Sequence, residues 1–399
     1  MTQTPRKIAV VHDFLYCYAG AERVLEQIIR LYPQADLFAL FDFLPPSQRN
    51  FLGGRAVNTS FLQRMPAARK RHRNYLPLMP LAVEQLDVSS YDLVISSSYV
   101  AAKGVLTRPD QLHICYCHSP ARFAWDLQNQ YLSESGLHRG VKSVLARLIL
   151  HYFRAWDVRS ANSVDVFIAN SETVAQRIRK IYRRDSIRVY PPVDLEQFLP
   201  RLEKEDFYLT ASRLVPYKKI NLIVQAFSST PKRKLIVIGE GPDFAKIARL
   251  AGPNITMLGF QSGQSLRDHM QRARAFVFAA EEDFGIVPLE AQACGTPVIG
   301  LGRGGLVETI IPGETGLFFD EQTPQSLLKA LDDFESRPFW DAELIRRNAE
   351  RFSIARFCDE FSGVVESQWD DFQSRRQRLS GMTGIVEESR KIPIRIGAK

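Results

Sequence analysis

The stretch EEDFGIVPLEAQACGTPVIG, residues 281–300, decides the fold of this chain. The apolar run AFVFAA at 275–280 precedes it and predicts a buried strand. Pro288 suits the first turn of a helix, because the N–H that proline lacks would have no partner there. Gly295 suits the end of that helix, so we expect a short helix from about Pro288 to Cys294. A strand, a turn and a helix in this order predict one unit of a parallel α/β sheet.

Two glutamates, Glu282 and Glu290, flank the turn of this unit. Glu282 follows the strand and Glu290 is predicted in the first helical turn, so both belong to the carboxyl edge of the sheet, where open α/β sheets bind ligands. The free N–H groups of residues 284–288 can receive an anion there. Glutamates beside that anion are better suited to accept hydrogen bonds from ribose or sugar hydroxyls. The alternative is that the acids only stabilise the helix N-terminus, by about 0.3–1 kcal/mol.

The same alternation of apolar runs and amphipathic helical patterns extends through most of the chain, which predicts parallel sheets. In the first half, the predicted strands are residues 7–14, 35–41, 91–98, 112–119 and 164–170. In the second half, they are residues 207–212, 234–239, 255–260, 275–280, 297–301 and 316–319. Between the halves, prolines and a cluster of charges interrupt the pattern at 189–206 and predict an interdomain linker.

We therefore expect an α/β fold of two doubly wound, Rossmann-like domains that face a central cleft. The N-terminal domain is predicted at residues 1–190 and the C-terminal domain at 207–355, with the linker at 191–206. A last helix is predicted at 356–379. Residues 380–399 lack a strong periodicity and are expected to be loosely ordered.

Composition and charge limit the kinds of partner. The 399 residues carry a formal net charge of +8, which favours anionic partners such as acidic lipids or phosphorylated small molecules. Nucleic acid is also anionic but is the least favoured partner, because the chain has no zinc-finger spacing, no aromatic-basic RNA signature and no long basic tail. No apolar run is long enough to span a bilayer, and the first one predicts a strand, not a signal peptide. The five cysteines are expected to be reduced thiols.

Basic and glycine-rich loops follow other predicted strands of the second half. Arg213 comes directly after the strand at 207–212, and Lys218 is near enough in sequence for both cations to reach one diphosphate. The loops GEGPD at 239–243 and GRGGLVE at 302–308 let the backbone approach a ligand closely. Together with the two glutamates, these loops favour a nucleotide-sugar site, and the alternative for each loop alone is a solvated loop.

The motifs of both halves carry a resemblance to a known family. In the second half, SRLVPYKK, IGEGPD, LGF, the Glu-x7-Glu pair, CGTPVIG, GGLVE and TGLFF occur in the order found in retaining glycosyltransferases of family 4, which have the GT-B fold. In the first half, VHDF, AGAERVLEQI, YCHSPARFAWD and IANS most resemble bacterial mannosyltransferases that build O-antigen and exopolysaccharide repeat units. This resemblance covers nearly the whole chain. It implies GDP-mannose as the usual donor and a polyprenyl-diphosphate-linked saccharide as the acceptor.

The resemblance also implies roles for individual residues. The catalytic set would be His118, Glu282, Arg213 and Lys218. The two cations would bind the donor diphosphate and stabilise it as a leaving group, Glu290 would hold the ribose hydroxyls, and Glu282 would contact the transferred sugar. His118 would face that sugar from the other domain, although a purely structural histidine is the alternative. Further donor-binding residues would be Gly241, Phe284, Gly285, Ile286 and Val287.

Other residues are candidates for lining the cleft, on weaker grounds. They are His12, Asp13, Gly20, Lys103, Gly304 and Gly305. The chain departs from the family in one N-terminal loop, which commonly reads Gly-Gly and here reads Ala19-Gly20. Alanine tolerates a positive φ poorly, so the approach of this loop to the donor depends on the conformation of Ala19.

The chemistry of transfer suits this set of residues. The bond to be broken is an acetal, so the transition state has oxocarbenium character, and fixed cations stabilise the departing diphosphate. The family retains the anomeric configuration, and a path in which the leaving phosphate deprotonates the acceptor would need no carboxylate nucleophile. The chain has no Asp-x-Asp motif and no His/Cys cluster with ligand spacing, so we predict no metal requirement and no cofactor.

Other functions stay open at this point. A UDP-sugar transferase of the same family differs only in the donor, and a GT-B nucleotide-sugar epimerase would share the C-terminal site without a lipid acceptor. A dinucleotide dehydrogenase would require Gly-x-Gly-x-x-Gly after the first strand, which HDFLYCYAGAE at 12–22 does not offer. A non-enzymatic sugar- or lipid-binding protein would not need the full set of cations and acids.

Two segments bear on the acceptor and on location. Residues 64–83 combine five Arg or Lys with an apolar run, which suits either an anionic membrane surface or a solvated helix followed by a packed loop. Residues 138–160 are amphipathic and basic, and we favour a core helix there. In the GT-B fold the last helix crosses back onto the N-terminal domain. We expect a cytoplasmic, peripheral protein at the inner face of the cytoplasmic membrane.

Overall fold

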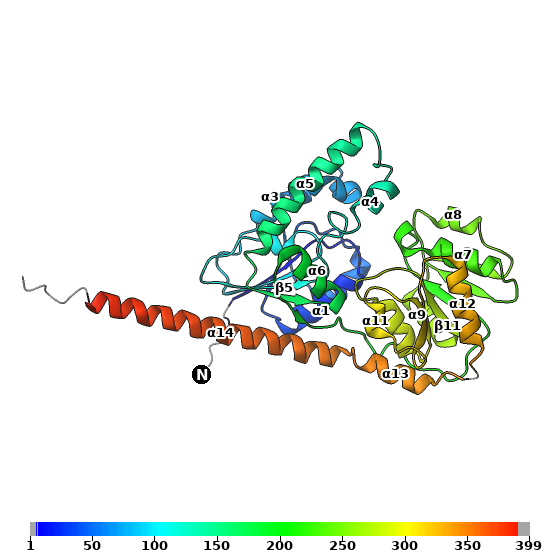
Figure 1. Cartoon of the computed structure of the whole chain (residues 1–399). Helices are drawn as coiled ribbons and strands as arrows, with labels where there is room; N and C mark the ends of the chain where they lie inside the picture. Colours follow the sequence, from blue (N-terminus) through cyan, green and yellow to red (C-terminus); the bar gives the residue numbers. More distant parts are fainter. Residues whose placement is uncertain (1–4, 6, 338, 390–399) are drawn as a thin grey trace, which may run out of the picture.

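The computed structural model of the chain contains two parallel sheets, one from each half of the sequence (Figure 1). The structure describes residues 5, 7–337 and 339–389, with side chains as far as residue 378. Each sheet lies between layers of helices, and the longest helix runs along the N-terminal domain and projects beyond it (Figure 1). The expected pair of doubly wound, Rossmann-like domains is therefore confirmed.

The N-terminal sheet has the strand order β3-β2-β1-β4-β5-β6-β7. Its strands are β1 (Ile8–His12), β2 (Asp36–Ala39), β3 (Val57–Thr59), β4 (Leu93–Ser98), β5 (Leu112–Cys117), β6 (Val166–Ala169) and β7 (Ile187–Arg188). The order reverses between β1 and β4, which pair with His12 opposite Ser97. In open α/β sheets a ligand crevice opens at such a reversal, outside the carboxyl ends of the strands.

The C-terminal sheet has the order β10-β9-β8-β11-β12-β13 and reverses between β8 and β11. Its strands are β8 (Tyr208–Ala211), β9 (Leu235–Ile238), β10 (Ile255–Gly259), β11 (Ala275–Phe278), β12 (Val298–Leu301) and β13 (Gly316–Phe319). All six were predicted from the sequence. The short strands β3 and β7 of the other sheet were not, because strands of two or three residues at or near a sheet edge leave no periodic pattern.

Helices cover both sheets. In the N-terminal domain they are α1 (Gly20–Leu31), α2 (Ala68–Arg71), α3 (Met79–Glu84), α4 (Gln128–Glu134), α5 (Val141–Ala161) and α6 (Glu172–Tyr182). The C-terminal half contributes α7 (Ile220–Ser228), α8 (Phe244–Ala248), α9 (Gly263–Arg272), α10 (Ile286–Ala293), α11 (Leu306–Thr309), α12 (Pro324–Glu335), α13 (Ala342–Glu350) and α14 (Ile354–Ser389). Short 3-10 turns are η1 (Pro46–Gln48), η2 (Asn50–Leu52), η3 (Phe61–Arg64), η4 (His72–Leu78), η5 (Ala102–Gly104) and η6 (Pro216–Lys218).

Helix α14 connects the two halves. Its buried side chains Phe357, Phe361, Val365 and Trp369 pack into the core of the N-terminal domain, against α1 and the sheet. The helix thus begins beside the C-terminal domain and crosses back to the N-terminal one (Figure 1). Residues 380–389, which were expected to be loosely ordered, continue the backbone of α14. Residues 390–399 lie outside the described part.

The two basic segments differ from each other in packing. In residues 64–83 the side chains of Met79, Ala82 and Val83 join the core, whereas the five cations are exposed. The solvated cations agree with the second alternative, but the packed apolar residues belong to helix α3 and not to a loop. In residues 138–160 the prediction of a core helix is only half right, because the first turns of α5 expose apolar side chains. Within the described residues, no helix is both long and apolar enough to cross a membrane.

Candidate functional site

The candidate site lies where loops from the two sheets meet. The Ser171 hydroxyl, after β6, donates a hydrogen bond of 2.6 Å to the carbonyl oxygen of Asp283, after β11. A Cβ atom added to Gly20 would lie 3.3 Å from the side chain of Ile286, which begins α10. Both contacts join segments that follow the carboxyl ends of strands. The ligand-binding edges of the two sheets therefore face each other, and their loops are in contact at these points.

Helix α10 differs from the prediction in one respect that affects Glu290. The helix spans Ile286–Ala293 and starts two residues earlier than predicted, after Gly285 in the left-handed conformation (φ 89°). Its first turn contains no acidic residue, so Glu290 lies in the second turn. The idea that this acid only stabilises the N-terminus of its own helix is therefore wrong, since that effect is confined to the first turn.

Glu290 is held from the opposite domain. Its side chain is 1% exposed, and its Oε1 accepts a hydrogen bond from the guanidinium of Arg23 on α1. Burial raises the pKa of Glu290, while the charge of Arg23 acts in the other direction. A carboxylate offers about four acceptor positions, so the pair with Arg23 leaves acceptor positions of Glu290 unused.

Lys218 and Glu282 form the second charged pair of the site. The Nζ atom of Lys218, in η6, donates to Oε1 of Glu282, and both side chains are largely shielded from solvent. Burial alone would lower the pKa of Lys218, but Glu282 and Tyr217 outweigh it, so the pKa is raised. The ammonium therefore stays charged while it lies 5.6 Å from the centre of the Phe278 ring. This is a fixed cation at the carboxyl edge of the sheet.

Arg213 provides a second cation on the same side. It is exposed in the loop between β8 and η6. Its charge helps to lower the pKa of His72 in the N-terminal domain, where burial and Arg73 contribute more. It also counteracts the rise in the pKa of Cys17 that burial and Glu22 cause. The charge of Arg213 is therefore near enough to the N-terminal domain to act on groups there.

The glycine-rich loops have a structural reason to be glycine-rich. A Cβ atom on Gly241 would collide with the backbone of Leu214, and one on Gly305 would collide with the backbone of Phe284. The N–H of Gly305 donates a hydrogen bond of 2.8 Å to the carbonyl of Glu282, and neighbouring Gly304 has a φ of 67°. These glycines thus let neighbouring loops pack on one another, and so fix the positions of the residues that carry charge.

The backbone conformation of Ala19 shows whether alanine is strained in the Ala19-Gly20 loop. Its φ of −137° is extended backbone, which alanine adopts without strain. The N–H of Ala19 donates to the carboxylate of Glu22 at 2.9 Å, which fixes the start of α1. The departure from Gly-Gly therefore leaves this loop in an ordinary conformation.

His118 lies at the carboxyl edge of the N-terminal sheet. It follows β5 and is 9% exposed. Its Nε2 atom is 2.8 Å from the Ser97 hydroxyl, and that same hydroxyl is 3.0 Å from Nδ1 of His12. Burial lowers the pKa of His118 to about 3, with a smaller contribution from His12. His118 is therefore a neutral imidazole held by Ser97, whose role the sequence did not suggest.

Burial of histidines leads to a prediction on acid stability. Burial also lowers the pKa of His113 to about 4, compared with about 6.5 in an unfolded chain. As the pH falls, His113 and His118 are therefore protonated in the unfolded chain before they are protonated in the folded one. The free energy of unfolding should then decrease below about pH 6.5, by up to about 1.4 kcal/mol per pH unit for each histidine. Urea titrations at several pH values measure the slope. His113→Gln should reduce this slope, whereas the control His151→Gln, at an exposed histidine, should leave it unchanged. An equal slope in the wild type and both variants would show that His113 does not cause the loss of stability.

Two candidates from the sequence are corrected by the structure. Asp13 is fully buried, and its carboxylate accepts hydrogen bonds from the backbone N–H groups of residues 99–102. Lys103 is 1% exposed and pairs with Asp157 beneath Trp156. Neither side chain reaches the cleft, because each satisfies a buried polar partner. His12 is also fully buried, with Nδ1 at 3.0 Å from the Ser97 hydroxyl and Nε2 at 3.6 Å from Oε1 of Glu22.

A set of interdomain contacts was missed by the sequence reading. Asp283 pairs with Arg122 at 3.1 Å and with Arg177, both from the N-terminal domain. Burial raises the pKa of Asp283, against the effect of the two arginines. On the neighbouring loop, Glu308 accepts hydrogen bonds from the backbone N–H groups of Glu172 and Thr173 at the start of α6. These contacts hold the domains together around the site.

Comparison with known families agrees with this arrangement. The family described as Glycosyltransferase Family 4 matches residues 18–197, and the family described as Glycosyl transferases group 1 matches residues 194–352. The two matches adjoin at the linker and together run through both domains. The chain belongs to glycosyltransferase family 4. Its membership confirms the resemblance to family 4, whereas the resemblance of the first half to mannosyltransferases stays a prediction. The GT-B arrangement of two facing domains is the fold of this family 4 chain.

Curated relatives of this family 4 chain include D-inositol 3-phosphate glycosyltransferases. The protein from Rhodococcus erythropolis is 31% identical over 238 residues, which is 51% of this chain and 53% of the relative. The protein from Corynebacterium urealyticum is 28% identical over 305 residues, 68% of this chain and 67% of the relative. The chain spans about half the length of several curated relatives that it matches.

Solved structures support the fold of this family 4 chain at low sequence identity. HepE from Anabaena, determined in complex with UDP, has a TM-score of 0.65 and 18% identity, and the match covers 90% of this chain and 100% of that one. Sucrose-phosphate synthase from Thermosynechococcus elongatus has a TM-score of 0.71 and 19% identity, with 91% and 99% covered. Identities this low carry the fold alone.

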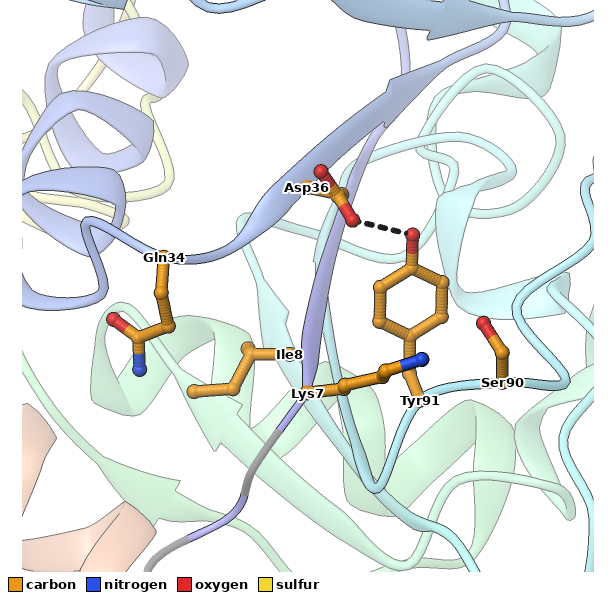
Figure 2. A pocket seen from close by; sticks show the side chains of 6 residues that line it. All are labelled: Lys7, Ile8, Gln34, Asp36, Ser90 and Tyr91. Atoms are coloured by element: carbon orange, nitrogen blue, oxygen red, sulfur yellow. Dashed lines mark hydrogen bonds between the residues drawn. The ribbon is translucent and has the colours of Figure 1, made fainter.

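A separate pocket lies elsewhere in this family 4 chain. Figure 2 shows it between Lys7, Ile8, Gln34, Asp36, Ser90 and Tyr91, where the Tyr91 hydroxyl donates a hydrogen bond of 2.7 Å to Asp36. These residues lie at or before the amino ends of β1, β2 and β4, opposite the edge that carries His118. Ligands of open α/β sheets bind at the carboxyl edge, so this pocket is not the candidate site. In the described part of the chain, no group of three or more His, Cys, Asp or Glu side chains could hold a metal ion.

Proposed function

We propose that this chain is a retaining, metal-independent glycosyltransferase that transfers mannose from GDP-mannose to a polyprenyl-diphosphate-linked saccharide. Lys218 carries the proposal, because it is a charged ammonium fixed at the ligand edge beside Glu282 and close in sequence to Arg213. The choice of donor and acceptor rests on the motifs of the first half. The product would serve bacterial surface polysaccharide assembly, with the protein at the inner face of the cytoplasmic membrane.

In this proposal the donor lies between the two domains. Its diphosphate contacts Arg213, Lys218 and the N–H groups at the start of α10, from Phe284 to Val287, with the loop at Gly241 close by. Its ribose hydroxyls bond to Glu290, beside Arg23. The transferred hexose lies between Glu282 and the neutral imidazole of His118. A neutral imidazole is suited to hold a sugar hydroxyl by a hydrogen bond, since burial keeps it uncharged at ordinary pH.

The transfer step then needs no protein nucleophile. The acceptor oxygen forms a bond to the anomeric carbon, and the bond between that carbon and the diphosphate oxygen breaks. The electron pair leaves with the diphosphate, whose growing negative charge is stabilised by Lys218 and Arg213. The acceptor proton passes to a leaving phosphate oxygen on the same face of the sugar. The anomeric configuration is retained by this path.

A different donor is the second candidate. HepE, which has a similar fold, was solved with UDP, and this favours a test of UDP-sugars beside GDP-mannose. The curated relatives are D-inositol 3-phosphate glycosyltransferases, and this likewise favours D-inositol 3-phosphate as a second acceptor to test. A GT-B epimerase would convert the nucleotide sugar without any acceptor, which separates it from a transferase in the same assay.

Thermal unfolding with nucleotides tests the donor. GDP is expected to raise the apparent melting temperature more than UDP, ADP or NAD at equal concentration, since a ligand that binds only the folded state stabilises it by mass action. The shift should be the same with a chelator and with added magnesium. A shift selective for UDP would replace the donor, and a shift with NAD alone would overturn the proposed function.

A further inference from the structure

Helix α5 has two apolar faces, and only one of them is covered by the described chain. Leu150, Phe153 and Trp156 are buried in the core of the N-terminal domain. On the other side of the helix, five large apolar side chains are exposed. These are Val141, Val144, Leu145, Leu148 and Tyr152, with exposed fractions between 51% and 87%.

The exposed side chains form one continuous stripe. Their spacing of three, four, seven and eleven residues from Val141 places them on a single side of the helix. At 1.5 Å per residue the stripe is about 17 Å long. The described residues contain seventeen exposed large hydrophobic side chains, and five of them lie on this one helix. A concentrated patch marks an interaction surface, whereas scattered single residues do not.

The charge around the stripe selects its partner. Residues 135–156 contain no aspartate or glutamate, and the exposed Lys142 and Arg147 flank the stripe. The cations of 64–73, also exposed, belong to a segment that packs in the same core cluster as the buried face of α5. A symmetric contact between two copies would bring these like charges together. An anionic lipid surface instead accepts both the apolar stripe and the cations.

The base of α5 is built rigidly. Asp157 accepts hydrogen bonds from the Trp125 indole at 2.7 Å and from the Tyr182 hydroxyl at 3.0 Å, and it pairs with buried Lys103. The Trp156 indole donates to Glu84 on α3 at 2.8 Å. The first turns of the helix lie at the end of the N-terminal domain farthest from its sheet (Figure 1). The stripe is therefore presented on a fixed, projecting element.

We infer that the exposed face of α5, from Val141 to Tyr152, docks on an anionic lipid bilayer. This inference deepens the proposed function, on which it rests for the lipid-linked nature of the acceptor. The apolar side chains enter the boundary between headgroups and acyl chains, and the flanking cations contact lipid phosphates. Docking places the N-terminal domain, which carries His118, beside the membrane that holds the acceptor.

Flotation with lipid vesicles tests this inference. The full chain is mixed with vesicles of phosphatidylcholine alone or of phosphatidylcholine with phosphatidylglycerol. The wild type is expected to float with the anionic vesicles and not with the neutral ones. The double variant Leu145→Ser/Leu148→Ser should lose about tenfold or more in partitioning, because it removes two exposed apolar side chains that the bilayer would bury. The matched control Leu199→Ser/Leu202→Ser changes two exposed leucines of the linker and should bind as the wild type does.

Each other outcome overturns the inference. If the wild type does not bind anionic vesicles, α5 is not a lipid-binding surface. The same conclusion follows if the α5 variant binds these vesicles as well as the control does. Sedimentation equilibrium measures the oligomeric state. If the wild type and the control form a dimer and the α5 variant is a monomer, a second copy of the chain covers the stripe. The assay contains no nucleotide or acceptor, so its result is independent of catalysis. The melting temperature with GDP, measured on both variants, reports separately on the proposed function.

Discussion

Replacing Lys218 by alanine is expected to slow sugar transfer by about 100- to 1000-fold, the usual effect of removing one fixed group that stabilises charge in a transition state. The ammonium pairs with Glu282 and remains charged in spite of its burial. The variant loses the cation that receives the leaving diphosphate and leaves the Glu282 carboxylate without that partner. The turnover number with saturating donor and acceptor measures the effect.

The fold should survive this substitution. Lys218 and Glu282 lie at the edge of the sheet, with side chains 17% and 25% exposed, and outside the hydrophobic core. The melting temperature of Lys218→Ala should therefore stay near that of the wild type, while its stabilisation by nucleotide becomes smaller. Lys246→Ala removes an exposed lysine from α8 in the same domain and is the matched control. Normal turnover in Lys218→Ala would exclude this residue from the mechanism.

The sequence predicted the elements that repeat and the residues that follow them. Strand β11 and helix α10 were expected because an apolar run, a turn and a proline-initiated helix are local signals. The position of Lys218 and Glu282 at one edge followed from parallel strands alone. The two-residue error at the start of α10 moved Glu290 out of the first turn, since residues before Pro288 also take helical conformation.

The sequence could not predict contacts between distant segments. Arg23 meets Glu290 across 267 positions, and nothing local to either residue indicates the other. The same limit applies to Asp283 with Arg122 and Arg177. For α5, apolar residues on two faces are typical of a helix inside a core, and only the packed structure reveals that one face has no cover among the described residues.

Replacing Asp13 is expected to destabilise the protein more than any other change considered. The sequence pattern at Asp13 suggested a ligand-binding residue at a strand end, whereas its role in the structure is to hold a loop. Asp13 follows β1 at the same edge as the site, as a ligand-binding acid would. Its carboxylate instead accepts four backbone hydrogen bonds, of 2.5, 2.8, 2.6 and 2.6 Å, from residues 99–102. Asp13→Ala leaves these donors without their acceptor in a buried loop. Each unsatisfied donor costs about 1–3 kcal/mol, so we expect a loss of at least about 3 kcal/mol.

Urea unfolding of Asp13→Ala, compared with Asp36→Ala, measures this loss. Asp36 begins the neighbouring strand, is exposed and accepts one hydrogen bond, from Tyr91, so its removal should cost about 1 kcal/mol or less. Asp13→Asn keeps one acceptor oxygen and should fall between the two. The same loop begins directly after β4, which supplies Ser97 to His118, so activity should decline in the same order as stability. If Asp13→Ala were no less stable than Asp36→Ala, the four hydrogen bonds would not be what positions this loop, and the placement of His118 would need another cause.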